Sequence, residues 1–155
     1  MTNNDLLRRL RYALNINDKT VMVCFNLGDY ELPQEELDSY FKRDEEEGYR
    51  SLHDKKFEHF LDGFIIHERG KQKPIEGAPV RKKIKLSNNE ILKKLRIALK
   101  LKDTDMIDIL YSADFRIAKA ELGAFFRPIG HKNYQECKDQ ILRTFIQGLT
   151  LRNKK

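Results

Sequence analysis

Histidine and cysteine, which often act as nucleophiles, proton carriers or metal ligands, are few in this sequence and scattered along the chain. The four histidines are His53, His59, His67 and His131. His59 and His67 are eight residues apart, about two helical turns, so they cannot hold one ion as histidines at positions i and i+4 would. The histidine spacing therefore indicates no metal site.

The two cysteines lack the surroundings of a nucleophile. Cys24 lies inside an apolar stretch, and Cys137 is far from it in the sequence. Two scattered cysteines are typical of buried thiols in a reducing compartment, not of a disulfide framework. A glycine-rich phosphate loop is also missing from the sequence. We therefore expect a non-enzymatic, cytoplasmic protein that carries no cofactor.

An acidic run, Asp44 to Glu47, gathers four carboxylates. Carboxylate oxygens suit Ca²⁺ and Mg²⁺, but this run lacks the alternating ligands and the glycine of an EF-hand loop. Charge runs without ligand geometry usually face water. We expect a solvated loop at this position.

Basic residues form another candidate site, because lysines and arginines on one surface can neutralise the phosphates of a nucleic acid. The candidate nucleic-acid contacts are Arg8, Arg9, Arg11, Arg81, Lys82, Lys83, Lys85, Lys93, Lys94 and Arg96. The alternative is a solvated helix face on which Arg11 and Arg96 pair with an aspartate such as Asp18 or Asp103. For the helical residues the sequence favours this alternative.

The net charge of +6 is unevenly distributed. Residues 1–69 contain 10 basic and 15 acidic side chains, a net charge of −5, whereas residues 70–87 carry +5 and residues 88–155 carry +6. This asymmetry has two explanations. Either the basic part meets a polyanion such as nucleic acid, or the oppositely charged halves attract one another within or between chains.

The elements that must position these side chains come in two copies. Residues 3–14, NNDLLRRLRYAL, match residues 88–99, NNEILKKLRIAL, at an offset of 85. The same offset relates a series of later identical pairs, Asp18/Asp103, Asp29/Asp114, Leu37/Leu122, Phe41/Phe126, Tyr49/Tyr134, Asp54/Asp139, Phe60/Phe145 and Gly63/Gly148. A constant register over this span indicates that one unit has been duplicated.

Each copy is predicted to form four helices. The expected fold class is all-α, a tandem duplication of a four-helix unit in which the copies could pack with pseudo-two-fold symmetry. We expect one helical repeat at residues 1–69, a basic linker containing proline and glycine at residues 70–87, and a second repeat at residues 88–155.

The predicted helix starts rest on polar residues that recur in both copies. Asn4/Asn89 and Asp18/Asp103 are predicted to cap the first and second helices, and the third helix begins near Pro33. Glu36/Glu121 and Asp54/Asp139 fall in first turns, where the helix dipole favours a carboxylate. Asp29/Asp114 are expected in the turn after the second helix.

The fourth helix has the clearest apolar stripe. Its residues are Phe57, Phe60, Leu61 and Phe64 in the first copy, and Leu142, Phe145, Ile146 and Leu149 in the second. Gly63 and Gly148 lie inside this helix, where glycine costs about 1 kcal/mol relative to alanine. We infer that a neighbouring backbone lies too close to each glycine for a side chain.

Three segments of the sequence also resemble a known family. They are DEEEGYRSLHDKKFEHFLDGFIIHERG (residues 44–70), NNEILKKLRIALKLK (residues 88–102) and HKNYQECKDQILRTFIQGL (residues 131–149). They are similar to the YehS family, bacterial cytoplasmic proteins built from two copies of a domain of unknown function. The resemblance implies no established activity, cofactor or catalytic residue.

These observations favour a binding module over an enzyme. We expect it to engage a protein partner or to self-associate as a homo-oligomer, with nucleic-acid binding through the first helices and the linker as the alternative. No uninterrupted apolar run is long enough to cross a bilayer, so no membrane partner is expected.

Overall fold

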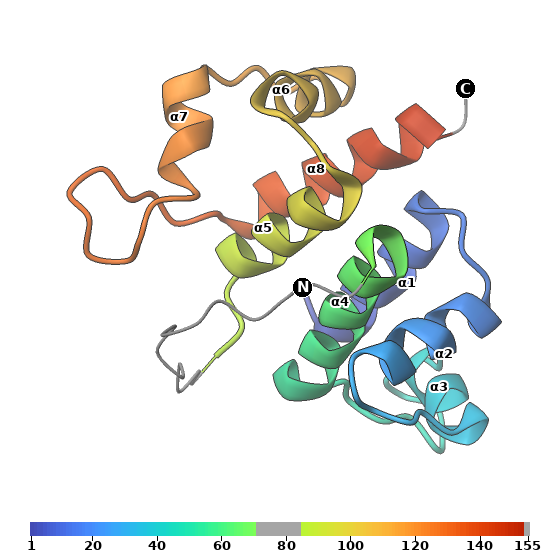
Figure 1. Ribbon diagram of the computed structural model, residues 1–155. Coiled ribbons are helices and arrows are strands. Elements are labelled where there is room, and N and C mark those ends of the chain that lie inside the picture. Colours follow the sequence, from blue (N-terminus) through green and yellow to red (C-terminus); the bar gives the residue numbers. More distant parts are fainter. Residues whose placement is uncertain (71–84, 154–155) are drawn as a thin grey trace.

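The structure of the chain is a computed structural model that describes residues 1–70 and 85–153 (Figure 1). Within these ranges the chain forms eight helices and no strand, which confirms the all-α prediction. The helices are α1 Asn3–Ala13, α2 Asp18–Leu27, α3 Gln34–Tyr40, α4 Asp54–Arg69, α5 Asn88–Leu99, α6 Asp103–Ser112, α7 Lys119–Ala124 and α8 Asp139–Asn153. Four helices come from each sequence repeat, in the same order.

The caps of the first helices differ from the prediction. Thr2 and Ser87 are the N-caps of α1 and α5, and their hydroxyl oxygens accept from the backbone N–H of Asp5 (3.1 Å) and Glu90 (3.2 Å). The prediction that Asn4 and Asn89 cap these helices is therefore wrong. A cap residue is non-helical and its side chain turns back to the helix end, whereas Asn4 lies within α1 and is buried.

The caps of the second helices are also one residue earlier than predicted. Asn17 and Lys102 are the N-cap residues of α2 and α6, so Asp18 and Asp103 are the first helical residues and not the caps. The third helix begins near Pro33 as predicted, with Pro33 as the N-cap residue of α3. Asp29 and Asp114 follow α2 and α6 as predicted, with left-handed φ angles of 71° and 64° that turn the chain.

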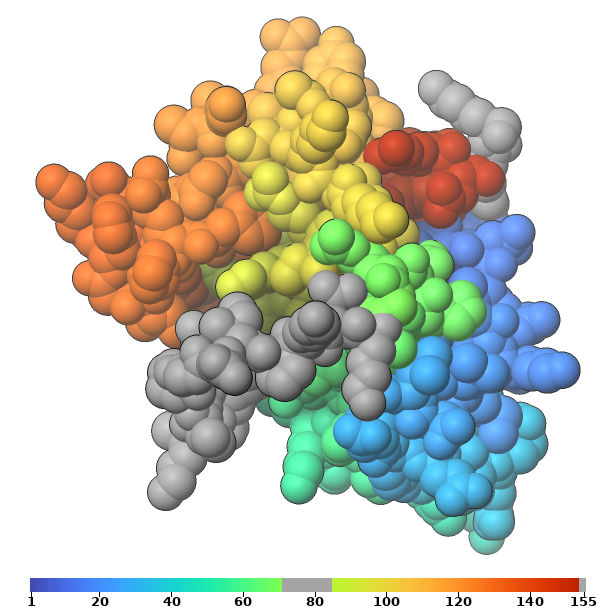
Figure 2. Space-filling view, viewed as in Figure 1, coloured from blue at the N-terminus to red at the C-terminus, as the bar shows by residue number. Residues whose placement is uncertain are grey.

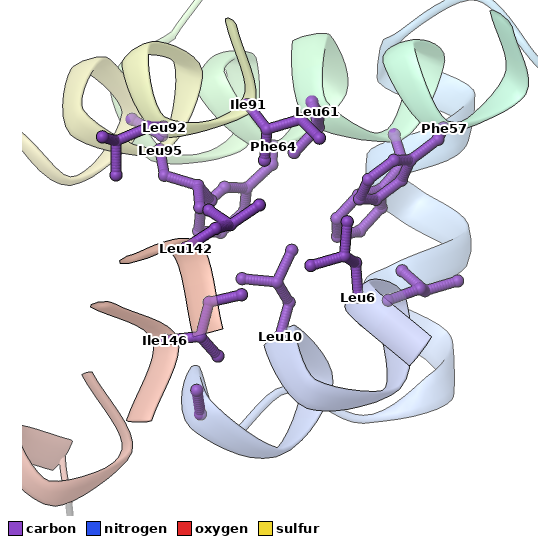
Figure 3. Packing of buried hydrophobic residues seen from close by; sticks show 14 of the residues in the cluster. Leu6, Leu10, Phe57, Leu61, Phe64, Ile91, Leu92, Leu95, Leu142 and Ile146 are labelled. Carbon is purple, nitrogen blue, oxygen red and sulfur yellow. The ribbon is translucent and has the colours of Figure 1, made fainter. Parts of the chain in front are cut away.

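The core is built where the two repeats meet. The first helix of each repeat packs on the fourth helix of the other, α1 on α8 and α5 on α4 (Figure 1). Figure 3 shows Leu6 and Leu10 of α1, Phe57 of α4, Ile91 of α5 and others converging on one apolar interior. Because each repeat makes the same helix contact with the other, the two repeats pack with the pseudo-two-fold symmetry that duplication of a unit allows.

Hydrogen bonds at the repeat junction follow the same symmetry. The Asp54 carboxylate at the start of α4 accepts from the backbone N–H of Leu86, 3.1 Å away, just before α5. The Asp139 carboxylate at the start of α8 accepts from the amino group of Met1, 3.4 Å away, just before α1. Leu86 is the counterpart of Met1 at the offset of 85. The start of the fourth helix in each repeat therefore binds the residue that precedes the first helix of the other repeat.

The remaining helices lie outside this junction. α2 packs on α4, and α6 packs on α8. A Cβ atom on Gly63 would lie 1.5 Å from the carbonyl oxygen of Cys24, and one on Gly148 would lie 2.1 Å from the carbonyl oxygen of Ile109. The prediction of a close backbone at both glycines is thus confirmed.

The apolar stripe predicted for the fourth helix is buried in both copies, in α4 and in α8. In the part of the chain that the structure describes, no helix is long and apolar enough to cross a membrane. The predicted linker falls almost wholly in residues 71–84, which lie outside the described residues.

Candidate functional site

A pocket occurs at the same place in both repeats. In the second repeat it is lined by Ser87, Asn89, Glu90 and Lys93 of the α5 start, by residues 125–129, and by Tyr134, with a volume of about 360 Å³. We call it the α5 pocket. In the first repeat it is lined by Thr2, Asn4, Asp5 and Arg8, by residues 41–46, and by Tyr49, with a volume of about 460 Å³. We call it the α1 pocket.

A buried asparagine builds the wall of each pocket. Asn89 donates its amide hydrogens to the carbonyls of Phe125 (3.0 Å) and Gln135 (2.9 Å) and accepts from the backbone N–H of Cys137 (2.9 Å). These partners lie on the two limbs of the loop between the third and fourth helices. One side chain therefore hydrogen-bonds to both ends of the loop, and its two amide hydrogens and its oxygen all have partners. We call this set of three hydrogen bonds the asparagine clasp.

The first repeat contains the same clasp. Asn4 donates to the carbonyls of Tyr40 (3.1 Å) and Arg50 (2.9 Å) and accepts from the N–H of Leu52 (2.9 Å). Sequence reasoning noted the identical asparagines but missed this role. The sequence does contain a signal for it. Thr2 and Ser87, two positions before the asparagines, can cap the helices themselves, so the asparagines are not needed as caps and can bond elsewhere.

An aromatic ring lines each pocket, and an arginine outside the pocket lies against that ring. The guanidinium of Arg96 lies 4.8 Å from the centroid of the Phe126 ring and donates to the carboxylate of Asp103 at 2.6 Å. Arg11 makes the corresponding contacts with Phe41, at 4.3 Å, and with Asp18. The predicted alternative, pairing of these arginines with aspartates, is confirmed, and it fixes the rings that line the pockets.

The rims of the two pockets carry opposite charges. The α1 pocket is lined by four acidic residues and three cations: Asp5, Asp44, Glu45, Glu46, Arg8, Lys42 and Arg43. At the offset of 85 the acidic run is replaced by Ile129, Gly130, His131 and Lys132. The α5 pocket therefore keeps Lys93, Arg127 and one acidic residue, Glu90, but has no counterpart of the acidic run.

The α5 pocket also presents an exposed apolar surface. Ile129 is 79% exposed, and Pro128 beside it is exposed as well. Lys93 and Arg127 are exposed, and within residues 1–70 and 85–153 neither forms an ion pair. In Figure 2 the orange segment that contains this loop forms one edge of the molecule. Apolar side chains next to free cations are the features of a docking surface for an acidic segment.

The structure distributes the predicted basic residues over several places. Lys93 lines the α5 pocket, and Lys94 donates to Asp62 of α4 across the repeat junction. Arg8 pairs with Asp5 at 3.3 Å. Lys85 is exposed just before α5, while Arg81, Lys82 and Lys83 lie outside the described residues.

A second basic surface lies at the end of α1. Arg8, Arg9 and Arg11 line a concavity of about 650 Å³ with the exposed ring of Tyr12 and with Asn153 of α8. Asn153 donates to the carbonyl of Ala13 at 2.7 Å and closes this end of the repeat junction. Cations beside an exposed aromatic ring are the groups that contact phosphates and bases in single-stranded nucleic acids.

A buried carboxylate in the first repeat was not foreseen by sequence reasoning. Glu36 accepts from Tyr30 (2.7 Å), from Lys56 (3.1 Å) and from Tyr40. Burial alone would raise the pKa of Glu36, but hydrogen bonds from the two tyrosines and Lys56 outweigh it and hold this pKa below its ordinary value. The carboxylate is therefore ionised and fully partnered, which suits a structural role.

This network exists in one repeat only. The positions of Tyr30, Tyr40 and Lys56 are occupied in the second repeat by Phe115, Phe125 and Ile141. The carboxylate of Glu121, the counterpart of Glu36, accepts from the N–H of Ala118 at 3.0 Å and is exposed. The prediction that both glutamates lie in first turns is confirmed. The partner Lys56 could not be predicted, because it lies in α4 and the periodicity of one helix does not relate it to Glu36.

The cysteines and histidines remain apart from both pockets. Burial raises the pKa of the Cys24 thiol and of the Cys137 thiol to about 12, so both are neutral near pH 7. The Nδ1 atom of His59 lies 2.5 Å from the carbonyl oxygen of Gly28. Among the described residues, no three histidine, cysteine or acidic side chains converge in a way that could hold a metal ion.

Comparison with known proteins is consistent with this duplicated architecture. The family described as "Protein of unknown function (DUF1456)" matches the chain twice, over residues 3–70 and 88–155. The chain is 39% identical over 153 residues to the uncharacterized protein YehS of Escherichia coli (strain K12), an alignment that covers 98% of this chain and 96% of that protein. No solved structure matches it significantly.

Proposed function

The chain belongs to the DUF1456 family, and from its two pockets we propose that it is a non-enzymatic protein-interaction module. The α5 pocket is the docking site in this proposal. Its ligand is an exposed acidic segment of a protein partner, with an apolar side chain that packs on Ile129 and Phe126.

One observation carries the proposal. The α5 pocket retains the asparagine clasp, the aromatic ring and two of the cations of the α1 pocket, and Glu90 in place of Asp5, but the acidic run of residues 44–47 is replaced by residues 129–132. Loss of the acidic run beside cations that form no ion pair within the described residues favours a ligand that supplies carboxylates. The exposed Ile129 adds apolar area that the ligand can cover.

The buried polar groups agree with a binding role. Among the described residues no buried side-chain nitrogen or oxygen lacks a hydrogen-bond partner. The thiols are neutral, and Glu36 is held ionised by its three donors. None of these groups is poised to move a proton in a reaction near pH 7.

A labelled acidic peptide tests the proposal. We expect a fluorescein-labelled peptide of glutamates around one phenylalanine to bind at low salt, and a peptide with lysines in place of the glutamates to fail. Replacing the pocket cations, Lys93→Glu with Arg127→Glu, should weaken binding at least about tenfold, because like charges then meet at the rim.

The matched control carries the same charge change elsewhere. Lys19 and Lys55 are exposed cations at helix starts in the first repeat, outside both pockets. Lys19→Glu with Lys55→Glu should leave peptide affinity near the wild-type value. Equal binding of the lysine peptide, or an equal loss in both double variants, would contradict a site at the α5 pocket.

The second candidate function is nucleic-acid binding through the first helices and the linker. It is favoured by the concavity at the end of α1, where Arg8 and Arg9 lie beside exposed Tyr12. Filter binding of single-stranded DNA and RNA across a salt series should then show affinity that falls with salt and with Arg8→Glu plus Arg9→Glu. No retention at low ionic strength would exclude this candidate.

A further inference from the structure

The acidic segment that fits the α5 pocket is present in this chain itself. We propose that the protein self-associates, with the acidic loop of one copy, residues 44–47, seated in the α5 pocket of a second copy. This inference rests on the proposed function, since it names the partner of the same site. It also accounts for the opposite net charges of the two repeats.

The acidic loop is available for an external contact. Residues 44–47 are all exposed. The Glu46 carboxylate accepts from the N–H of Arg43 at 3.0 Å and holds the turn, whereas the carboxylates of Asp44, Glu45 and Glu47 form no hydrogen bond or ion pair within the described ranges. Three carboxylates without a partner among the described residues therefore lie on this exposed turn.

The α5 pocket offers the complementary groups. Lys93 and Arg127 have no carboxylate partner among the described residues, and Ile129 next to them is almost fully exposed. In the first repeat, Asp44, Glu45 and Glu46 of the acidic loop line the same cavity as Arg8 and Lys42, the counterparts of these cations at the offset of 85. The first repeat thus brings an acidic loop to the cavity that contains these cations, whereas residues 129–132 of the second repeat supply no carboxylate there.

The contact must form between chains. Asn4 binds the carbonyls of Tyr40 and Arg50 on both limbs of the acidic loop, so the loop cannot swing away from the first repeat. In Figure 1 the loop after α3 and the loop after α7 lie on opposite sides of the central helices. Only the acidic loop of another copy can therefore enter the α5 pocket.

Two complementary variants test this contact. The loop variant Asp44→Asn, Glu45→Gln, Glu47→Gln spares Glu46, which stabilises the turn, and keeps the α5 pocket intact. The pocket variant Lys93→Glu, Arg127→Glu keeps the acidic loop intact. All five substituted side chains are exposed, and circular dichroism confirms that each variant is folded before association is measured.

Sedimentation velocity over a concentration series gives the readout. Wild-type protein should sediment faster as its concentration rises at low salt, and this rise should disappear at high salt because the contact is between charges. Each variant alone should remain a monomer, or associate at least about tenfold more weakly than wild type. An equimolar mixture should associate, since one variant supplies the pocket and the other supplies the loop.

Several results would overturn the inference. They are a wild-type monomer at every concentration and salt, association that survives in either variant alone, or a mixture in which no complex forms. The acidic peptide separates this failure from failure of the proposed function. If the peptide binds the α5 pocket while the wild-type chain stays monomeric, only self-association is refuted; if the peptide does not bind, both are refuted.

Discussion

Glu36 and Glu121 occupy equivalent positions in the two repeats, yet only Glu36 is buried. Three donors, Tyr30, Tyr40 and Lys56, converge on its carboxylate. A buried carboxylate with these partners is stabilised as an ion, and loss of its charge leaves the lysine without compensation. The difference between the two glutamates therefore allows a test at the scale of one residue.

We expect Glu36→Gln to lower the free energy of unfolding at pH 7 by about 1–3 kcal/mol, because a neutral amide satisfies fewer of these donors. Urea denaturation measures this change. Glu121→Gln is the matched control, since a glutamine at the third helical position can still accept from the Ala118 N–H. A control loss as large as that of Glu36→Gln would contradict the assignment.

The pKa of Glu36 gives this contribution a definite pH dependence. The folded protein holds this pKa below its ordinary value of 4.5. The stabilisation is therefore complete above the pKa of the unfolded chain and is lost as the pH falls through the lower pKa of the folded state. Wild-type protein and Glu36→Gln should differ most near neutral pH and converge in acid. A difference in unfolding free energy that grows below pH 4 would contradict this sign.

At the scale of the element, a glycine lies at the closest contact of each of two helix pairs, α2 with α4 and α6 with α8. Gly63 of α4 faces the Cys24 carbonyl of α2, and Gly148 of α8 faces the Ile109 carbonyl of α6. Gly28, in turn, leaves no room for a side chain because a Cβ atom there would lie 1.8 Å from the carbonyl oxygen of His59. These contacts join backbone to backbone, so a side chain can be accommodated only if the helices move apart.

We expect Gly63→Ala and Gly148→Ala each to lower the unfolding free energy by about 3 kcal/mol or more, since the clashing atoms are backbone and cannot rotate away. Gly123→Ala in α7 is the control. A Cβ atom at Gly123 would meet nothing within 4 Å, so this change should be neutral or stabilise by up to about 1 kcal/mol. Thermal and urea unfolding measure whether Gly63→Ala and Gly148→Ala are less stable than Gly123→Ala. Equal unfolding midpoints for the three variants would contradict this order of stability.

The helices and their apolar faces were largely predictable from the sequence. The stripe of Phe57, Phe60, Leu61 and Phe64 was visible because it depends only on the period of its own helix. The clasp by Asn4 was not, since its three partners come from residues 40, 50 and 52. The α5 pocket was hidden for the same reason: it is formed by segments more than 30 residues apart in the chain, which periodicity within one helix cannot bring together.

At the scale of the whole molecule, the two repeats share one core. Because α1 packs on α8 and α5 packs on α4, neither repeat buries its own first helix alone. Leu10 and Ile146 illustrate this in Figure 3, where side chains from both repeats meet in the same apolar cluster. The chain should therefore unfold as one cooperative unit.

Separated repeats should show this dependence directly. We expect fragments of residues 1–70 and 85–155 to lack cooperative unfolding transitions when each is alone, since each would expose the apolar faces of its first and fourth helices. Mixing them should restore helical content and a single transition, followed by circular dichroism. Cooperative unfolding of either fragment near the midpoint of the intact chain would contradict a shared core.

The central claim is that the α5 pocket docks an acidic segment, and a residue-resolved titration tests it most directly. In a two-dimensional amide NMR spectrum of the labelled chain, the glutamate-phenylalanine peptide should shift the signals of Lys93, Arg127, Ile129 and Tyr134. These shifts should vanish in Lys93→Glu with Arg127→Glu and persist in Lys19→Glu with Lys55→Glu. Absence of shifts at the pocket, or shifts centred on Arg8 and Arg9 at the end of α1, would contradict the claim.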